Sequence, residues 1–168
     1  HITVDSTPGE GSCFSIYLPA HGEPLSVQKA GVLSEKEKPR VRTNRVLVMD
    51  DEALLLEVAG EFLSSFGFDV GTAKNGEEAV ERYKRAMLSG KPFDVVILDM
   101  TVKIGMGGKA AVRKILEIDP YARVIVSTGF DQDPIHTEYR KYGFVEIIPK
   151  PYSARKLKDI LSKVLDET

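Results

Sequence analysis

Residues 93–101 read Phe-Asp-Val-Val-Ile-Leu-Asp-Met-Thr (FDVVILDMT), and this stretch decides the fold class. Four apolar residues follow one another from Val95 to Leu98, so a strand here is apolar on both of its faces. Such a strand is typical of the centre of a parallel sheet, because helices cover both faces of that kind of sheet. We therefore predict a strand over 93–98 in the middle of a sheet with two covered faces.

Outward from this strand, short apolar runs alternate with amphipathic stretches from residue 44 to the end of the chain. Strands are predicted at residues 45–49, 68–73, 93–98, 123–128 and 145–148. Helices are predicted at residues 52–65, from 75 onward, and at 109–118, 134–142 and 153–165. Five repeats of strand and helix predict a doubly wound α/β fold, with a parallel sheet and right-handed crossovers.

The beginning of the chain follows a different pattern. Apolar and polar residues alternate at 2–4 and at 14–18, with turn residues at 8–11, which predicts a β-hairpin over 1–18. Residues 20–43 are punctuated by proline and glycine and are predicted to be a linker. Two strands alone are only marginally stable, so the hairpin needs a partner surface. Because the chain opens in mid-strand without Met, we expect it to be a piece of a longer protein.

The composition narrows the classes of function. The 168 residues carry a formal net charge of -2, with Lys and Arg spread along the chain, so no nucleic-acid partner is expected. No apolar run approaches the roughly 20 residues that a membrane span needs, so no membrane contact is expected. Cys13 is the only cysteine, which excludes an internal disulfide and favours a reducing, cytoplasmic setting.

Polar side chains follow four of the predicted strands. Asp50 and Asp51 follow the first strand, and Asp99 follows the third. Thr128 ends the fourth strand, and Lys150 follows the fifth. Taken singly, each has an ordinary structural explanation as a helix cap, a turn residue or a surface lysine. Because ligands bind outside the carboxyl ends of parallel strands, we expect all five side chains to converge at one edge of the sheet.

This set of side chains suits phosphoryl transfer. Clustered carboxylates repel one another, and a cation among them relieves the repulsion. Their oxygens suit Mg²⁺, which takes one or two carboxylates together with phosphate oxygens. The remaining carboxylate can attack phosphorus and form an acyl phosphate. Lys150 and Thr128 supply an ammonium and a hydroxyl for the phosphoryl oxygens. The sequence therefore predicts transfer that depends on Mg²⁺, positioning and charge.

Four motifs carry a resemblance to the response regulator receiver (CheY-like) family over residues 44–168. They are, in order, VLVMDDE at 46–52, VVILDM at 95–100, IVSTG at 125–129 and IIPKPY at 147–152. The resemblance implies a flavodoxin-like (βα)5 fold with strand order 2-1-3-4-5. It also implies a domain that is a phosphorylated switch in two-component signalling.

The resemblance assigns a role to each site residue. Asp99 is implied to be the phosphoacceptor and a metal ligand, with Asp51 as a direct Mg²⁺ ligand. Asp50 is implied to bind the metal through water or to support the site, and Thr101 to offer its backbone carbonyl. Thr128 is the implied switch hydroxyl. Lys150 is the implied phosphate-binding lysine, and its bond to Pro151 resembles the cis peptide of the family.

Three features depart from the family pattern. The loop at 101–108, TVKIGMGG, is rich in glycine, lacks the common proline and is one residue longer, which predicts mobility. Ile147 stands where the family usually has Tyr or Phe, so an aromatic switch is not expected. Phe130, two residues after Thr128, is bulky and apolar, which predicts a long-lived phosphoryl state. A phosphoryl lifetime of seconds would contradict that last expectation.

The first 19 residues resemble the last hairpin of a histidine-kinase ATPase domain, through GEGSCFSIYLP at 9–19. The resemblances together imply three parts: a hairpin remnant at 1–19, a linker at 20–43 and a receiver at 44–168. The implied parent is a hybrid sensor histidine kinase. This chain lacks the ATP-binding motifs and the phosphorylatable histidine of such kinases, so it should not phosphorylate itself from ATP.

We expect the chain to accept a phosphoryl group on Asp99 from the phosphohistidine of a histidine kinase or a histidine phosphotransfer domain. It would be a switch with weak self-catalysis of phosphotransfer and hydrolysis. The resemblance to the receiver family implies Tyr139, Tyr142 and Ile147 as candidate output residues. The alternatives are a receiver-like scaffold that is not phosphorylated and a haloacid-dehalogenase-like phosphatase, which would need a second Asp where Thr101 stands. A flavodoxin-type carrier is disfavoured, because the acidic site would repel a flavin phosphate.

Overall fold

The computed structural model describes residues 1–7, 9, 11–17, 43–129 and 135–166. The chain divides into two compact units, His1–Pro39 and Arg40–Thr168. Each unit is described by itself. Among the described residues, no helix combines the length and the apolar character that crossing a membrane requires.

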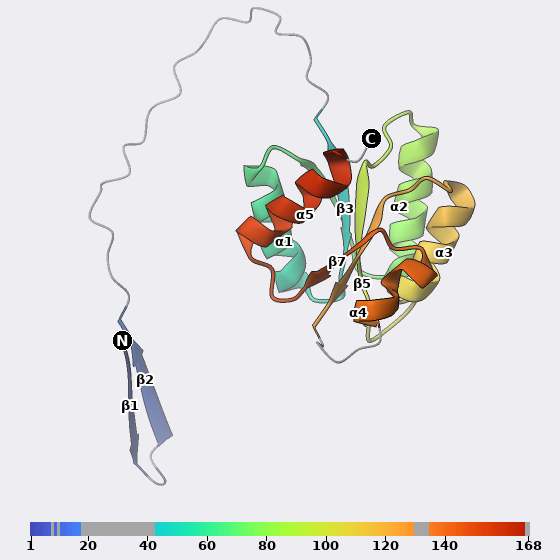
Figure 1. Cartoon of the computed structure of the whole chain (residues 1–168). Helices are drawn as coiled ribbons and strands as arrows, with labels where there is room; N and C mark the ends of the chain where they lie inside the picture. Colours follow the sequence, from blue (N-terminus) through green and yellow to red (C-terminus); the bar gives the residue numbers. More distant parts are fainter. Residues whose placement is uncertain (8, 10, 18–42, 130–134, 167–168) are drawn as a thin grey trace, which may run out of the picture. The chain divides into compact units, whose positions relative to one another are not determined.

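A sheet of five parallel strands forms the centre of the second unit (Figure 1). The strands are β3 (Arg45–Met49), β4 (Asp69–Ala73), β5 (Val95–Asp99), β6 (Val124–Thr128) and β7 (Glu146–Pro149). Their order across the sheet is β4-β3-β5-β6-β7, which is 2-1-3-4-5 counted within this unit. The predicted doubly wound, flavodoxin-like fold is therefore confirmed.

Helices cover both faces of the sheet (Figure 1). They are α1 (Ala53–Ser65), α2 (Gly76–Leu88), α3 (Gly108–Ile118), α4 (Ile135–Glu138) and α5 (Ala154–Asp166), with a 3-10 turn, η1, at Tyr139–Tyr142. Helices α1 and α5 pack on one apolar cluster, and α2 and α3 pack on the other. Every residue of β5 is buried, because this strand is central and both of its faces are covered. The prediction from the run at 95–98 is confirmed.

The fourth helix differs from the prediction of one helix over 134–142. Pro134 lies outside the described residues, and the α-helix is only four residues long before it tightens into η1. Gly143 ends this segment with φ of 95°. The positive φ favours glycine here, and a Cβ would in addition lie 2.3 Å from Leu116 Cδ1, so the Leu116 side chain would have to move. A 3-10 turn at the end of a helix is common, and the periodicity of the sequence does not reveal it.

The first unit is an antiparallel hairpin of β1 (Ile2–Thr7) and β2 (Gly11–Ile16), as predicted. Ile2 pairs with Ile16, and Val4 pairs with Phe14, so the four apolar side chains share one face. All four are more than half exposed within the unit. Leu18 and the predicted linker up to residue 42 lie outside the described residues.

Candidate acidic site at the carboxyl edge of the sheet

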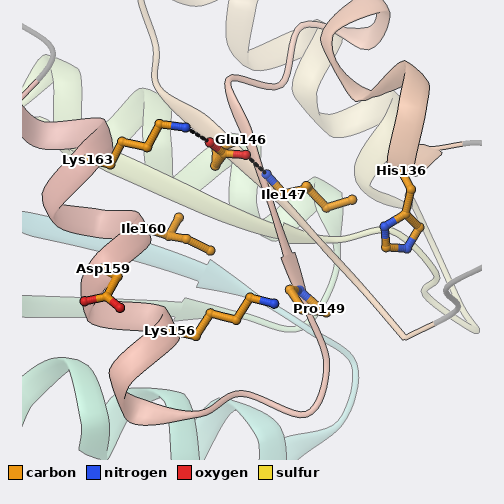
Figure 2. A pocket seen from close by; sticks show the side chains of 8 residues that line it. All are labelled: His136, Glu146, Ile147, Pro149, Lys156, Asp159, Ile160 and Lys163. Carbon is orange, nitrogen blue, oxygen red and sulfur yellow. Dashed lines mark hydrogen bonds and ion pairs between the residues drawn. The ribbon is translucent and has the colours of Figure 1, made fainter.

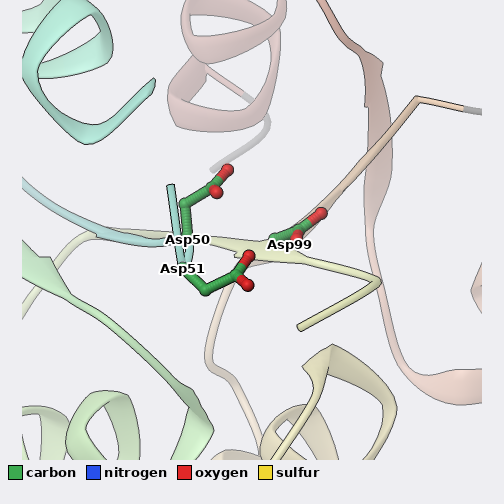
Figure 3. Close-up of side chains that lie close together, drawn as sticks. All are labelled: Asp50, Asp51 and Asp99. Atoms are coloured by element: carbon green, nitrogen blue, oxygen red, sulfur yellow. The ribbon is translucent and has the colours of Figure 1, made fainter. Parts of the chain in front are cut away.

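Three carboxylates meet where β3 and β5 end (Figure 3). Asp50 and Asp51 directly follow β3, and Asp99 is the last residue of β5. One oxygen from each lies within 4.8 Å of the others. Asp50 is fully buried and Asp99 is 4% exposed, so these charges are largely withdrawn from water. The parallel pairing of β3 with β5 produces this convergence of residues far apart in the sequence.

Lys150 is the cation of the site. Its ammonium nitrogen lies 2.6 Å from Asp50 Oδ2 and 2.9 Å from Asp99 Oδ1, and its side chain is only 15% exposed. The Lys150 N–H also donates to the Thr128 carbonyl at 2.8 Å, which holds the residue against the end of β6. The bond from Lys150 to Pro151 is cis, as the family resemblance implies. The structure thus brings Lys150 to the same edge as the carboxylates.

One ammonium does not balance the charge of three carboxylates. Burial raises the pKa of Asp99 above its ordinary value; hydrogen bonding to Lys150 only partly opposes this, and the nearby Asp50 adds to the rise. For Lys150, burial pulls the pKa down, but its contacts with Asp50 and Asp99 outweigh burial and raise the pKa. The Asp99 shift is thus chiefly an effect of burial, and the Lys150 shift is an effect of its two carboxylate partners.

The donor atoms of the cluster fit a hard divalent cation. Asp50 Oδ2 is buried and has no hydrogen bond of suitable geometry, although the Lys150 ammonium lies beside it. Asp51 accepts a hydrogen bond of 3.1 Å from the Lys103 N–H. A pocket of about 230 Å³ opens here, and Thr101 lies on its wall. Carboxylate and carbonyl oxygens with room for water are the ligands that Mg²⁺ prefers.

The residues predicted for the site do not all line the pocket, and Asp50 and Thr128 are not on its wall. Asp51, Asp99, Thr101 and Lys150 line it. Thr128 is 3% exposed at the end of β6 and joins the site through its carbonyl, which accepts from the Lys150 N–H. Its side chain is not on the wall of the pocket.

The glycine-rich loop after Asp99 is attached to the start of α2. Met106 N–H donates to Glu77 Oε2 at 2.8 Å, and the Met106 carbonyl accepts from Gly76 N–H at 2.7 Å. The Met106 N–H is the main reason that the pKa of Glu77 is lowered. Sequence reasoning missed Glu77, because nothing in its spacing from Asp99 indicates the contact.

Close packing, rather than mobility of the loop, explains why residue 108 is a glycine. A Cβ on Gly108 would lie 2.6 Å from the Asp99 carbonyl oxygen, which belongs to the backbone and cannot swing aside. We expect Gly108→Ala to displace the loop or the end of β5, and to lower both Mg²⁺ affinity and phosphoryl uptake by about ten-fold. Calorimetric titration with Mg²⁺ and the rate of phosphorylation check this.

Gly60→Ala is the matched control for that substitution. Gly60 lies inside α1, and a Cβ there would meet no atom within 4 Å. The change should raise the free energy of unfolding by roughly 1 kcal/mol through helix propensity. Equal Mg²⁺ affinity in Gly108→Ala and Gly60→Ala would show that Gly108 does not support the site.

The raised pKa of Asp99 predicts how the site responds to pH. Without metal, Asp99 should titrate above the ordinary value of 3.8, and Mg²⁺ should move its midpoint down. Because the folded-state pKa is raised, the contribution of Asp99 to stability falls as pH rises from the ordinary value through the raised one. Carboxyl ¹³C NMR measures the midpoint directly. An Asp99 midpoint at or below the ordinary value of 3.8 would contradict the prediction.

A second pocket, of about 510 Å³, lies between β7 and α5 (Figure 2). Ile147 and Ile160 contribute apolar surface, and charged side chains of α5 stand around it. Glu146 forms an ion pair with Lys163 and accepts a hydrogen bond of 3.1 Å from the Ile147 N–H. Ile147 thus lines a hollow at the position where the family resemblance leads one to expect an aromatic ring. The predicted residue Phe130 lies outside the described residues.

Fold and site together define a class of protein: a doubly wound α/β domain with a cluster of three carboxylates at the carboxyl edge of its sheet and a lysine beside them. The model of the response regulator receiver domain matches residues 46–162. The chain belongs to this family. It is 36% identical over 121 residues to the chemotaxis protein CheY of Thermotoga maritima, covering 71% of this chain and 96% of that protein. It is therefore a receiver domain of two-component signalling, and receiver domains bind Mg²⁺ through acidic residues.

Two further relatives differ in what they cover. One chain in a crystal structure of the CheX-CheY-BeF3-Mg complex from Borrelia burgdorferi has a TM-score of 0.66 and 30% identity to this chain, covering 72% of this chain and 88% of that chain. The sensor kinase CckA of Brucella abortus is 27% identical over 174 residues, covering 99% of this chain but 18% of that protein. The second alignment therefore extends beyond the receiver into the hairpin and linker regions.

Proposed function

We propose that Asp99 accepts a phosphoryl group from a phosphohistidine, with Mg²⁺ held by Asp50, Asp51, Asp99 and the Thr101 carbonyl. The observation that carries this proposal is the cluster of three carboxylates within 4.8 Å, with the Lys150 ammonium 2.9 Å from Asp99. No other arrangement among the described residues gathers three potential metal ligands in this way.

Asp99, Lys150 and Thr128 would each have a separate role in the phosphoryl transfer. An Asp99 carboxylate oxygen attacks phosphorus, the P–N bond of the phosphohistidine breaks, and its electron pair stays on the imidazole nitrogen. Lys150 turns from the carboxylates to a phosphoryl oxygen, and the Thr128 hydroxyl donates to another. Bound Mg²⁺ would supply positive charge against the charge that develops on the phosphoryl group.

The test is uptake of phosphate from a small donor. The chain is incubated with acetyl phosphate, with Mg²⁺ or with a chelator, and its intact mass is followed over time. We expect a gain of one phosphoryl group that requires the metal. A gain that is equally fast in chelator would contradict the metal site, and no gain under any condition would favour the scaffold alternative.

The phosphatase alternative finds no support at the site. Its mechanism needs a second acid two residues after the nucleophile, and that position is Thr101. Turnover of a small phosphate ester such as p-nitrophenyl phosphate would revive it. Under the proposal, each Asp99 takes up one phosphoryl group and releases it slowly.

We also propose that residues 1–19 are the last hairpin of a histidine-kinase ATPase domain, residues 20–43 a linker and residues 44–168 the receiver. The sensor-kinase alignment over 99% of the chain supports this, since alignment to the receiver alone would stop near residue 44. The exposed apolar face of the hairpin would then be covered by the rest of that domain. The parent would be a hybrid sensor kinase, and the receiver would work in the cytoplasm. Coding sequence upstream of His1 without an ATP-binding domain would contradict this.

We also propose that the output surface comprises the pocket lining shown in Figure 2, which includes Ile147, together with Tyr139 and Tyr142 of η1. Tyr139 Oη donates to Glu146 Oε1 over 3.5 Å, and the Lys109 ammonium lies 4.5 Å from the centre of the Tyr142 ring. The new charge on Asp99, about -1.5 to -2, would bias this surface through Lys150 and Thr128. The donor remains a histidine kinase or a histidine phosphotransfer domain.

A further inference from the structure

Two hydroxyl groups beside the acidic site have no role in the proposed function so far. Ser127 is fully buried on β6, and its Oγ lies 2.9 Å from the Oη of Tyr152, at hydrogen-bonding distance. Tyr152 lies between β7 and α5 and packs on the apolar cluster under α1 and α5. A serine buried in a strand is satisfied only by a partner that reaches it, so this bond fixes where the Tyr152 ring lies.

The bond joins the segments that carry the site residues. Ser127 pairs with Asp99 across β5 and β6, and its carbonyl accepts from Met100 N–H at 2.9 Å. It also directly precedes Thr128. Tyr152 comes two residues after Lys150. The Ser127–Tyr152 bond therefore ties the turn that carries Lys150 to the strand pair that carries Asp99 and Thr128.

The charges of Lys150, Asp50 and Asp99 affect the pKa of the Tyr152 hydroxyl. Burial is the main reason that the pKa of Tyr152 is raised to about 12. The negative charges of Asp50 and Asp99 raise it further, whereas the hydrogen bond to Ser127 and the positive charge of Lys150 lower it. Tyr152 is thus neutral at physiological pH and acts as a hydrogen-bonding group rather than as an acid or base.

We propose that Tyr152 is a positioning residue for Lys150: its bond to Ser127 holds the turn so that the ammonium stays within reach of Asp99 and of a phosphoryl oxygen. This inference rests on the proposed function of Asp99. Lys150 has a long, flexible stem, and its ammonium must move from the carboxylates to the phosphoryl group. A small shift of its backbone would misplace the charge in the transition state and leave metal binding unchanged.

The experiment compares Tyr152→Phe and Ser127→Ala with the unchanged chain. Phosphorylation by acetyl phosphate is measured at saturating Mg²⁺, and Mg²⁺ affinity is measured separately by calorimetry. We expect each variant to slow phosphorylation by about three- to ten-fold, the effect of one hydrogen bond, with unchanged Mg²⁺ affinity. In a Lys150→Ala background, Tyr152→Phe should have no further effect, because the group that it positions is gone.

Tyr83→Phe is the matched control. Tyr83 is also buried, and its Oη donates to Asp119 Oδ2 at 2.8 Å, away from the acidic site. Tyr83→Phe should lower the unfolding temperature without slowing phosphorylation. Equal slowing by Tyr83→Phe would assign the effect of Tyr152→Phe to general destabilisation and overturn the inference.

Three further results would overturn the positioning role of Tyr152. An unchanged rate in Tyr152→Phe, a loss of Mg²⁺ affinity, or an equal slowing in the Lys150→Ala background would each overturn the role of Tyr152 while Asp99 remains the phosphoacceptor. Failure of the unchanged chain to take up phosphate would overturn the proposed function, and this inference with it.

Discussion

Asp99→Asn should abolish phosphoryl uptake from acetyl phosphate. Asparagine keeps the size and shape of the side chain, but its amide is a poor nucleophile and carries no charge for the metal. The carboxylates of Asp50 and Asp51 would remain, so weak Mg²⁺ binding should persist. We expect the rate of phosphorylation to fall by at least about a thousand-fold, since the attacking group itself is lost. Intact mass spectrometry over several hours measures it.

Stability separates this loss of activity from misfolding. Asp99 is a buried carboxylate whose pKa is raised, so removing its charge should raise the metal-free unfolding temperature at neutral pH. Asp159→Asn is the control, because Asp159 is an exposed carboxylate on α5. It should change neither the rate nor the stability appreciably. Normal uptake by Asp99→Asn would mean that another residue accepts the phosphoryl group.

Lys150→Ala should have the second largest effect. The substitution leaves Asp50 and Asp99 buried beside each other without the cation that contacts both. We expect a loss of about 2–3 kcal/mol in the metal-free free energy of unfolding at neutral pH, because a buried charge loses its partner. The rate of phosphorylation should fall by about a hundred-fold, since a preorganised positive charge is lost from the transition state.

The pH and metal dependence of this variant make the prediction specific. Without the ammonium, the pKa of Asp99 should rise further, so the stability deficit should shrink as the pH falls and the carboxylate takes up a proton. Mg²⁺ should restore part of the stability, but not the rate. Lys84→Ala, on the exposed side of α2, is the control. Equal stability of Lys150→Ala and Lys84→Ala in urea at neutral pH would contradict the charge balance described for the site.

The sheet could be predicted because its three inner strands, β3, β5 and β6, are buried apolar runs. Each predicted strand lies within two residues of the observed one, and the buried run at 95–98 placed the centre correctly. The segment after β6 could not be predicted as well. Its α-helix gives way to η1, where Tyr139 and Tyr142 pack against the core, and helical periodicity does not distinguish a final 3-10 turn from an α-turn.

The sequence predicted which residues meet at the carboxyl edge of the sheet, but it did not predict the contacts that they make there. The residues that follow parallel strands must meet at one edge, which is why Asp51, Asp99 and Lys150 come together. The bond of Glu77 to the loop and the bond of Ser127 to Tyr152 depend on loop paths and side-chain directions. Spacing along the chain contains no signal for either. The sequence also does not predict which of the carboxylates Lys150 contacts; the structure shows that they are Asp50 and Asp99.

The most direct test of the account is to locate the phosphoryl group. The chain is treated with acetyl phosphate and Mg²⁺, the acyl phosphate is trapped by reduction, and the modified peptide is sequenced by mass spectrometry. We predict a single modification on Asp99. A modification on Asp50, on Asp51 or on any residue outside the acidic edge would contradict the assignment of Asp99 as the phosphoacceptor.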